Sequence, residues 1–365
     1  MDGRFQLIGA EASYYTGKVR AYLHWKGLPF DEVLATAEVY RTVIVPKTGV
    51  RYIPVVITPE GDALQDSTEI IDACERRVPE PSVYPVTPVQ RLVALLFEIY
   101  GDEWLVLPAM HFRWSFEENR EFILREFGRT LYPEASDAEH RARGMEASAP
   151  FSGALPLLGV TPETIPAIEA WTAELFTQMC HHLARHPFLL GTRPSIGDFG
   201  LLGPLYAHLY RDPYPGRLMR EKASRIARWV ERLNTLPPRS GDFLPDDEVP
   251  ETLVPILRRM VAEHLPVMRD TARLLAEWLR DNPGRRIPRV IGFHEFTIGG
   301  VRAQRAVFPY TVWMLQRAVD HCRALTGRDR CRVGTFLREI GAYDALAEPL
   351  PCRVARDHNR LVVAS

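Results

Sequence analysis

The first 85 residues of the chain alternate between short β-branched or apolar runs and helical segments. Strands are predicted at residues 5–8 and 30–34 and at the run Val55-Val56-Ile57, with room for one more short strand after it. Helices are predicted at 18–25 and 67–77, and a weaker one at 36–44. The order β-α-β-α-β-(β)-α makes the first two strands parallel, joined by a right-handed crossover. Residues 78–85, rich in proline, then read as a linker.

From Pro88 onward the apolar spacing becomes helical. Helices are expected at 90–104 and 116–127, and a long one from Pro162 to His186, where Pro187 ends it. Residues 144–161 are rich in small residues, glycine and proline, and are predicted to form a loop. Residues 234–255 hold five prolines around an acidic run and are predicted to form a second linker.

The remainder of the chain mixes helices and strands. A helix is expected at 252–281, broken or kinked near Pro266. Two alternating runs, 289–298 and 301–308, are joined by Gly299-Gly300, which predicts a β-hairpin. Another helix opens at Pro309, and a weak pair of short strands is possible around 352–363.

Composition and charge narrow the class of protein. Apolar residues make up 46% of the 365 residues and charged residues 25%, with a formal net charge of −1, so neither a nucleic acid nor a membrane surface is indicated as partner. No apolar stretch approaches the roughly 18 residues of a membrane span, and the N-terminus lacks a signal peptide's apolar region. Five scattered cysteines form neither a disulfide framework nor a zinc spacing, so we expect a reducing cytoplasm.

The stretch around Pro54 combines a proline at the head of a strand with a capped helix. At the head of a strand the missing N–H of Pro54 is tolerated, and the Ile53–Pro54 bond can be cis. A bend at this point is expected to leave the backbone of Ile53 unpaired. Asp66-Ser67 then opens a helix, with Glu69 at the spacing of a capping box. Such a helix start is a natural seat for a carboxylate, although Asp66 and Ser67 could serve only as a cap.

Ile53-Pro54 followed at this distance by Asp66-Ser67 resembles the glutathione-binding half of glutathione S-transferases. The resemblance implies that the cis-proline loop pairs with the cysteinyl backbone of glutathione and that the acid–serine pair holds its γ-glutamyl end. It also implies a thioredoxin-like α/β domain over 1–85 and an all-α domain over 88–236. Residues 237–365 form an α+β extension for which the family offers no guide. Glutathione, a small electrophile and a second copy of the chain, as a homodimer, are the partners it implies.

The loop before the first helix holds the candidates for thiol activation. Ser13 stands where serine- and cysteine-type members of the family place their catalytic residue, so we expect it to stabilise the thiolate. Tyr14, Tyr15 and Thr16 offer rival hydroxyls, and both tyrosines are expected beside glutathione. Because position 13 is not a cysteine, thiol–disulfide exchange is not expected.

A second motif and three weaker signals complete the set. Ser195 and Asp198, in the segment Phe188-Leu-Leu-Gly-Thr-Arg-Pro-Ser-Ile-Gly-Asp-Phe199, match the family's capping box, whose role there is structural. His182 and His186 lie one helical turn apart, but a solvated helix face is favoured and no metal is expected. Two further groups have aromatic members: residues 111–116 could line an apolar pocket or pack in the core, and Tyr310, Trp313 and Arg317 are expected to bury against the helical domain.

These expectations predict a glutathione transferase that conjugates glutathione to an electrophilic, mostly apolar small molecule. The alternatives are a non-catalytic module that binds a partner protein through the extension, or a glutathione-dependent isomerase or ether-cleaving enzyme. The hairpin at Gly299-Gly300 is too small to stand alone. The extension is therefore expected to dock on the body and to narrow the active cleft.

Overall fold

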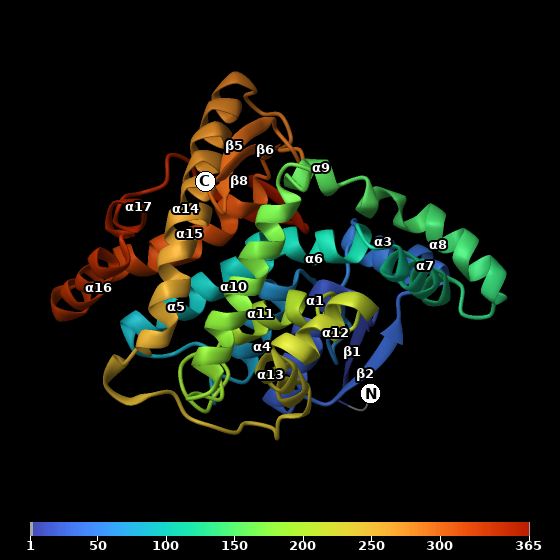
Figure 1. The fold of residues 1–365 in the computed structure, drawn as a ribbon, viewed down its shortest axis with the longest axis horizontal. Coiled ribbons are helices and arrows are strands. Elements are labelled where there is room, and N and C mark those ends of the chain that lie inside the picture. Colours follow the sequence, from blue (N-terminus) through green and yellow to red (C-terminus); the bar gives the residue numbers. More distant parts are fainter. Residues whose placement is uncertain (1–2, 365) are drawn as a thin grey trace.

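The chain opens with a four-stranded sheet in the order β2-β1-β3-β4. The computed structural model describes residues 3–364, and Figure 1 shows them as a ribbon. The strands are β1 (Phe5–Gly9), β2 (Phe30–Leu34), β3 (Val55–Ile57) and β4 (Ala63–Gln65). The β1 and β2 strands are parallel, as predicted, whereas β3 runs antiparallel to both β1 and β4.

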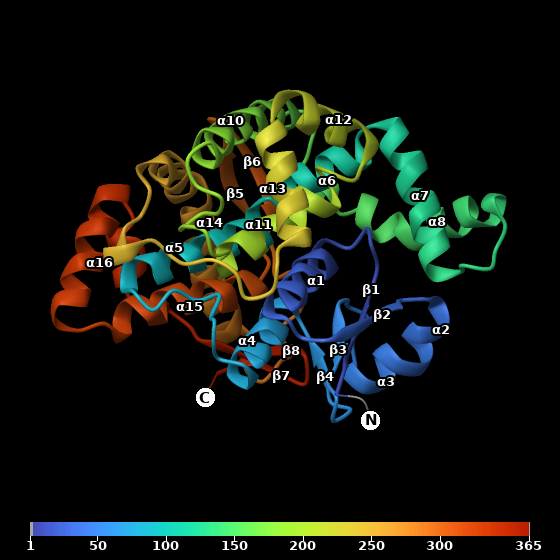
Figure 2. The ribbon, with the colours of Figure 1, turned by 90° about the horizontal axis from the view of Figure 1, so that it is seen from below.

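The two faces of this sheet are buried in different cores because successive side chains point to opposite sides. Leu7 and Val56 pack with α1 (Tyr14–Lys26) and α4 (Ser67–Arg77), between the sheet and the helical domain (Figure 2). Ile8 and Val55 join a smaller core with Ile44, under the segment formed by α2 (Ala37–Val39), η1 (Tyr40–Ile44) and α3 (Val45–Thr48). The thioredoxin-like arrangement of the N-terminal domain is thus confirmed.

An all-α region follows. Its elements are α5 (Pro88–Ile99), η2 (Tyr100–Trp104), α6 (Val106–Trp114), α7 (Glu117–Leu131), α8 (Asp137–Ser152), α9 (Leu155–Leu158), α10 (Ile165–Leu183), α11 (Ile196–Ala207), α12 (Pro213–Lys222) and α13 (Ser224–Thr235). At the start of the buried α11, Ser195 and Asp198 form the predicted capping box. Asp198 accepts from the Ser195 N–H at 2.9 Å and hydroxyl at 2.8 Å, and from the Leu189 N–H at 3.0 Å.

The prediction of a loop over residues 144–161 is wrong, because most of this stretch lies in α8 and α9. The α7 and α8 helices form a hairpin that projects from the body (Figures 1 and 2). A Cβ atom at Gly144 would lie 1.7 Å from the Leu124 carbonyl oxygen, and one at Gly128 would lie 2.0 Å from that of His140. These glycines therefore permit close contact of two helices and mark no turn.

The extension is built from one long helix, two hairpins and three further helices. Its elements are η3 (Pro245–Asp247), η4 (Glu251–Leu253), α14 (Val254–Asp281), β5 (Phe293–Ile298), β6 (Val301–Ala306), α15 (Tyr310–Ala324), α16 (Gly327–Ile340), α17 (Tyr343–Ala347), β7 (Val354–Asp357) and β8 (Arg360–Val363). The hairpin at Gly299-Gly300, the helix opened by Pro309 and the final pair of strands are all present. Of the break or kink expected near Pro266, the break is absent, since α14 continues through the proline.

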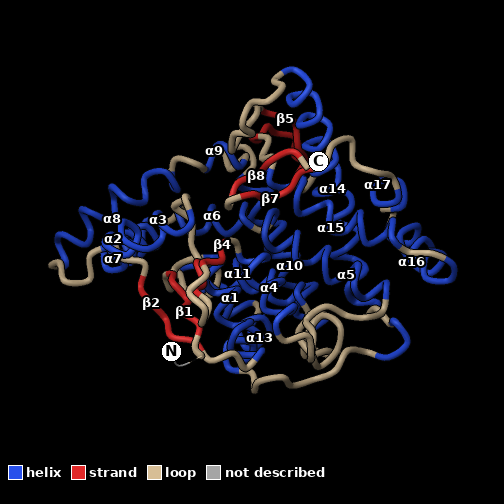
Figure 3. Tube along the Cα trace, turned by 180° about the vertical axis from the view of Figure 1, so that it is seen from behind, coloured by secondary structure: helices blue, strands red, loops and turns tan. Residues whose placement is uncertain are grey.

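The extension lies against both preceding regions. The predicted linker is held to the body: Asp247 accepts from the N–H groups of Val89 and Gln90 at the start of α5. The α15 and α16 helices pack on α5, and the β7–β8 hairpin lies beside α4 and β4 (Figures 2 and 3). Within residues 3–364, none of the helices has both the length and the apolar composition that crossing a membrane requires.

Candidate active site

Strand register gathers the predicted site residues at one edge of the sheet. Ile8 near the end of β1 pairs with Val55 at the start of β3, and Val55 pairs with Gln65 at the end of β4. The loop after β1, the segment before β3 and the residues after β4 therefore meet at the same edge. Ser13, Ile53-Pro54 and Asp66-Ser67 lie on these three segments.

Ser13 caps the first helix. Its backbone is extended, and its side-chain oxygen accepts from the Thr16 N–H at 3.3 Å. Because the hydroxyl acts there as an acceptor, its own proton remains available to a further group. The side chain is partly buried at the N-terminus of α1, where helix N–H groups favour a negative charge.

The rival hydroxyls in this loop have other environments. Tyr14 is buried and donates to the Gly101 carbonyl, whereas Tyr15 donates to the Asp102 carbonyl at 3.0 Å. Burial raises the pKa of both phenols well above the ordinary value. The Thr16 hydroxyl is enclosed and has no hydrogen-bond partner among the described residues. Each tyrosine has a single hydroxyl proton and gives it to a main-chain oxygen, which leaves uncommitted hydroxyl protons on Ser13, partly exposed, and on Thr16, fully enclosed.

The two remaining motifs have the local geometry that their residues predict. The Ile53–Pro54 bond is cis, Pro54 is buried, and no hydrogen bond joins the Ile53 backbone to another described residue. Asp66 caps α4 with φ 84°, a left-handed value uncommon for a residue other than glycine. Its Oδ1 accepts from the N–H groups of Thr68 at 2.9 Å and Glu69 at 3.3 Å. Ser67, the first residue of the helix, is 5% exposed.

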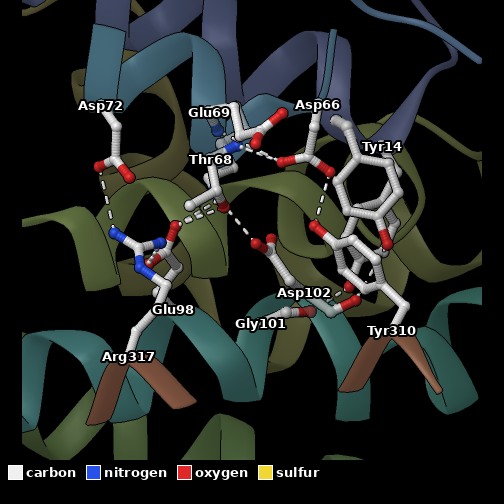
Figure 4. A network of polar contacts seen from close by, with 12 residues as sticks. Tyr14, Asp66, Thr68, Glu69, Asp72, Glu98, Gly101, Asp102, Tyr310 and Arg317 are labelled. Atoms are coloured by element: carbon white, nitrogen blue, oxygen red, sulfur yellow. Dashed lines mark hydrogen bonds and ion pairs between the residues drawn. The ribbon is translucent and has the colours of Figure 1, made fainter. Parts of the chain in front are cut away.

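The extension supplies residues to this edge that the sequence analysis did not find. Tyr310 of α15 donates to Asp66 Oδ2 at 2.6 Å (Figure 4). Arg356 of β7 donates to Glu69 at 2.9 Å and to Gln65 at 2.8 Å, and its Nη1 lies 3.7 Å from Asp66 Oδ2. Nothing in the local sequence marks Arg356, since its partners lie almost three hundred residues earlier in the chain.

A buried ionic network lies behind the site and joins all three regions. Lys18 of α1 is fully buried and lies 2.9 Å from Glu98 and 2.6 Å from Asp102. Arg317 of α15 donates to Glu98 at 3.0 Å and to Asp72 of α4 at 3.1 Å (Figure 4). Burial raises the pKa of Glu98, but Arg317 and Lys18 outweigh burial and hold it below its ordinary value.

The helix face of Tyr310 and Arg317 contacts the N-terminal domain in addition to the expected helical domain. Tyr310 is bonded to Asp66 of the N-terminal domain, and Arg317 bridges α5 to α4. Next to Tyr15, burial raises the pKa of the Glu103 carboxyl to about 7, and Thr311 donates to that carboxyl at 2.6 Å.

In the helical region, His182 and most of the aromatic segment 111–116 are packed into the protein interior. His182 is fully buried between Thr252 and the Phe188 carbonyl, so the expected solvated helix face is wrong at this residue. Among residues 3–364, no group of three or more histidine, cysteine, aspartate or glutamate side chains could hold a metal ion. In the segment 111–116, Phe116 stacks on Tyr214 of α12 at 4.2 Å, which is core packing.

Comparisons with known proteins find similarity in two regions of the chain. A search of curated proteins finds no match. Residues 7–82 match the family model "Glutathione S-transferase, N-terminal domain", and residues 161–237 match "Glutathione S-transferase, C-terminal domain". Neither match continues beyond residue 237.

Solved structures similar to this chain include several glutathione S-transferases. One from Methylobacterium radiotolerans, in complex with glutathione sulfonate, is 23% identical, covers 67% of this chain and 100% of its own, and has a TM-score of 0.41. A β-etherase from Sphingobium sp. strain SYK-6 is 16% identical, covering 64% and 96%, with a TM-score of 0.41. A rice enzyme in complex with glutathione is 18% identical, covering 64% and 88%, with a TM-score of 0.38. With the two domain models matched in order, the chain carries the N- and C-terminal domains of the glutathione S-transferase family within residues 7–237.

Proposed function

We propose that this chain is a glutathione transferase that conjugates glutathione to an electrophilic, mostly apolar small molecule. In this proposal the Ser13 hydroxyl donates to the glutathione sulfur and stabilises the thiolate. The backbone of Ile53 beside Pro54 holds the cysteinyl part, and Asp66 and Ser67 hold the γ-glutamyl group. Tyr14 and Tyr15 shape the thiol side of the cleft. By resemblance, we also propose a homodimer in a reducing cytoplasm.

The observation that most supports the proposal is the uncommitted proton of Ser13 at the N-terminus of α1. A free thiol with a pKa of about 8.5 is only slightly ionised at neutral pH. Lowering that pKa by about 2 units requires about 2.7 kcal/mol of preferential stabilisation of the thiolate. A hydroxyl that donates to the sulfur contributes about 1.5–3 kcal/mol, and a helix N-terminus about 0.3–1 kcal/mol more. The two groups together account for a shift of this size.

The chemical step is a nucleophilic attack. The ionised sulfur of glutathione forms a bond to an electrophilic carbon of the co-substrate. The electron pair of the bond that breaks leaves with a departing group or, in an addition, moves onto the co-substrate and is protonated by solvent. The same thiolate could also serve an isomerisation or an ether cleavage, so the products formed with each class of co-substrate distinguish these reactions.

One observation favours a second candidate, a non-catalytic module that binds a partner protein. Both oxygens of Asp66 already accept hydrogen bonds, Oδ1 from backbone N–H groups and Oδ2 from Tyr310 of the extension. A chain that never releases this contact has no acceptor there for a ligand. Direct binding of glutathione, measured by titration calorimetry and by retention on glutathione-agarose, separates the two functions.

The catalytic role is tested with Ser13→Ala. The variant should keep glutathione binding but raise the pKa of the bound thiol by at least about one unit, since a hydrogen bond to the anion is lost. Thiolate absorbance followed against pH measures this shift.

Ser136→Ala is the matched control, because Ser136 caps α8 by accepting from Glu139 and lies outside the site. It should leave the titration unchanged. An unchanged titration in Ser13→Ala would instead assign the role to another hydroxyl of the loop.

A further inference from the structure

The start of α4 forms a cation-binding cluster. Gln65, Asp66 and Glu69 each direct a side-chain oxygen to the same guanidinium, that of Arg356, at 2.8, 3.7 and 2.9 Å. The rings of Tyr310 and Trp313 lie 5.9 and 5.8 Å from its central carbon. Acidic oxygens together with aromatic faces are the surroundings that a cation prefers.

Arg356 is built into this position. Only 7% of its side chain is exposed. The hairpin that carries it is fixed at both ends: Gln316 exchanges two hydrogen bonds with the Val354 backbone, at 2.8 and 2.7 Å, and Asn359 donates to the Thr48 carbonyl at 2.9 Å. The guanidinium is therefore a specific contact between β7 and the N-terminal domain.

The same cluster is the site proposed above for the γ-glutamyl group of glutathione. That group carries a carboxylate and an α-ammonium, and Ser67 with the N-terminus of α4 suits only the carboxylate. The ammonium needs carboxylate or amide oxygens as acceptors, and those at the start of α4 are paired with Arg356. A second cation competes with the guanidinium for them, because like charges in a partly desolvated site repel each other.

We propose that Arg356 is an internal occupant of the ammonium subsite and that glutathione binds by displacing its guanidinium. This inference rests on the proposed glutathione binding and adds a feature of the chain that regulates that binding. The β7–β8 hairpin lowers the affinity of the chain for ligands whose cation must take the same acceptors. The hairpin lowers the affinity for ligands without that cation by a smaller factor.

The test compares two thiols and two proteins by titration calorimetry. The thiols are glutathione and glutaryl-cysteinyl-glycine, which lacks only the α-amino group, and the proteins are the parent and Arg356→Gln. We expect Arg356→Gln to bind glutathione about tenfold or more tightly than the parent, in line with one or two charge-assisted hydrogen bonds no longer contested. Its gain for the deaminated thiol should be at least about threefold smaller.

A second variant and a control keep the test sharp. Tyr310→Phe frees Asp66 Oδ2 with the loss of one hydroxyl and should shift glutathione affinity in the same direction. Arg353→Gln is the control, because Arg353 lies just before β7, is 54% exposed and pairs with Asp320. It should leave both affinities unchanged.

Three results would overturn the inference: weaker glutathione binding by Arg356→Gln, an equal gain for both thiols, or no gain at all. The first would mean that Arg356 holds the ligand's carboxylate. Failure of all the proteins to bind either thiol would overturn the proposed function together with the inference, and is distinguishable from these three results.

Discussion

Removing the Arg317 guanidinium should destabilise the protein strongly, because this side chain connects the extension to both other regions. Arg317 donates to Glu98 at 3.0 Å, to Asp72 at 3.1 Å and to the Tyr84 hydroxyl at 2.6 Å. Its side chain is 17% exposed and that of Glu98 only 1%. The variant Arg317→Met keeps an apolar stem of similar length and removes the charge together with the N–H donors.

The magnitude follows from the burial of the partners. Breaking a fully buried ion pair by removing one member costs about 3–5 kcal/mol, since a charge is left without compensation. Glu98 retains Lys18 at 2.9 Å, and Arg317 itself keeps some contact with solvent. We therefore expect Arg317→Met to lower the free energy of unfolding by about 2–4 kcal/mol near neutral pH.

The loss should also depend on pH. Burial raises the pKa of Glu98, but Arg317 and Lys18 hold the folded value below the ordinary one. A carboxyl with a depressed folded pKa stabilises the protein above its unfolded pKa, and that contribution disappears as the pH falls through the folded value. The difference in free energy of unfolding between parent and variant should therefore be largest near neutral pH. It should shrink as the pH falls below the pKa of a free glutamate.

Urea denaturation at neutral pH and in the acidic range measures both effects. Arg323→Met is the control, because Arg323 is an exposed residue of the same helix. It should change the free energy of unfolding by less than about 0.5 kcal/mol. An Arg317→Met variant that is as stable as this control, or whose deficit is the same at both pH values, would refute the role assigned to the network.

Three further predictions address the ligand site, the cleft and the extension. Ser67→Ala should weaken glutathione binding by about 1–3 kcal/mol in calorimetry, because the ligand's carboxylate loses a donor; unchanged binding would place the γ-glutamyl group elsewhere. Burial raises the pKa of Glu103 to about 7, so its contribution to stability is present at low pH and lost as the pH rises through that value. Glu103→Gln keeps an acceptor for Thr311 and should therefore stabilise the chain, relative to the parent, more at about pH 8 than at about pH 5 in urea denaturation; an equal difference at both would contradict the assignment. Truncation after Asp242 should lower the melting temperature and increase binding of a hydrophobic dye, because α14, α15 and α16 share the main core; a truncated chain of unchanged stability would show an independent module.

Local sequence preference determined the elements whose cause lies within a few residues. Ser195 and Asp198 cap α11 because a carboxylate three positions after the cap residue accepts from that residue's N–H and hydroxyl. Gly299-Gly300 turns the β5–β6 hairpin because both glycines adopt positive φ, 55° and 80°, at little steric cost. The strand headed by Pro54 and the helix capped by Asp66 were predictable for the same kind of reason.

The same local rules failed at the α7–α8 hairpin. The small residues around Gly144 predict a loop, but this composition cannot distinguish a glycine inside a helix from a glycine in a turn. Here the deciding factor is the Leu124 carbonyl of the neighbouring helix, which leaves no room for a Cβ atom. That constraint exists only once the two helices have packed together.

In the candidate site, contacts between residues far apart in the chain determine what local sequence patterns do not. The family resemblance assigned its three segments to one site and favoured Ser13, but no local pattern distinguishes the environments of the four neighbouring hydroxyls in residues 13–16. They became different only when the carbonyls of Gly101 and Asp102 accepted those of Tyr14 and Tyr15. The pairing of Arg356 with Gln65 spans 291 positions. Hydrogen bonds between residues so distant depend on how whole domains pack, and no local pattern of hydrophobic and polar positions encodes that packing.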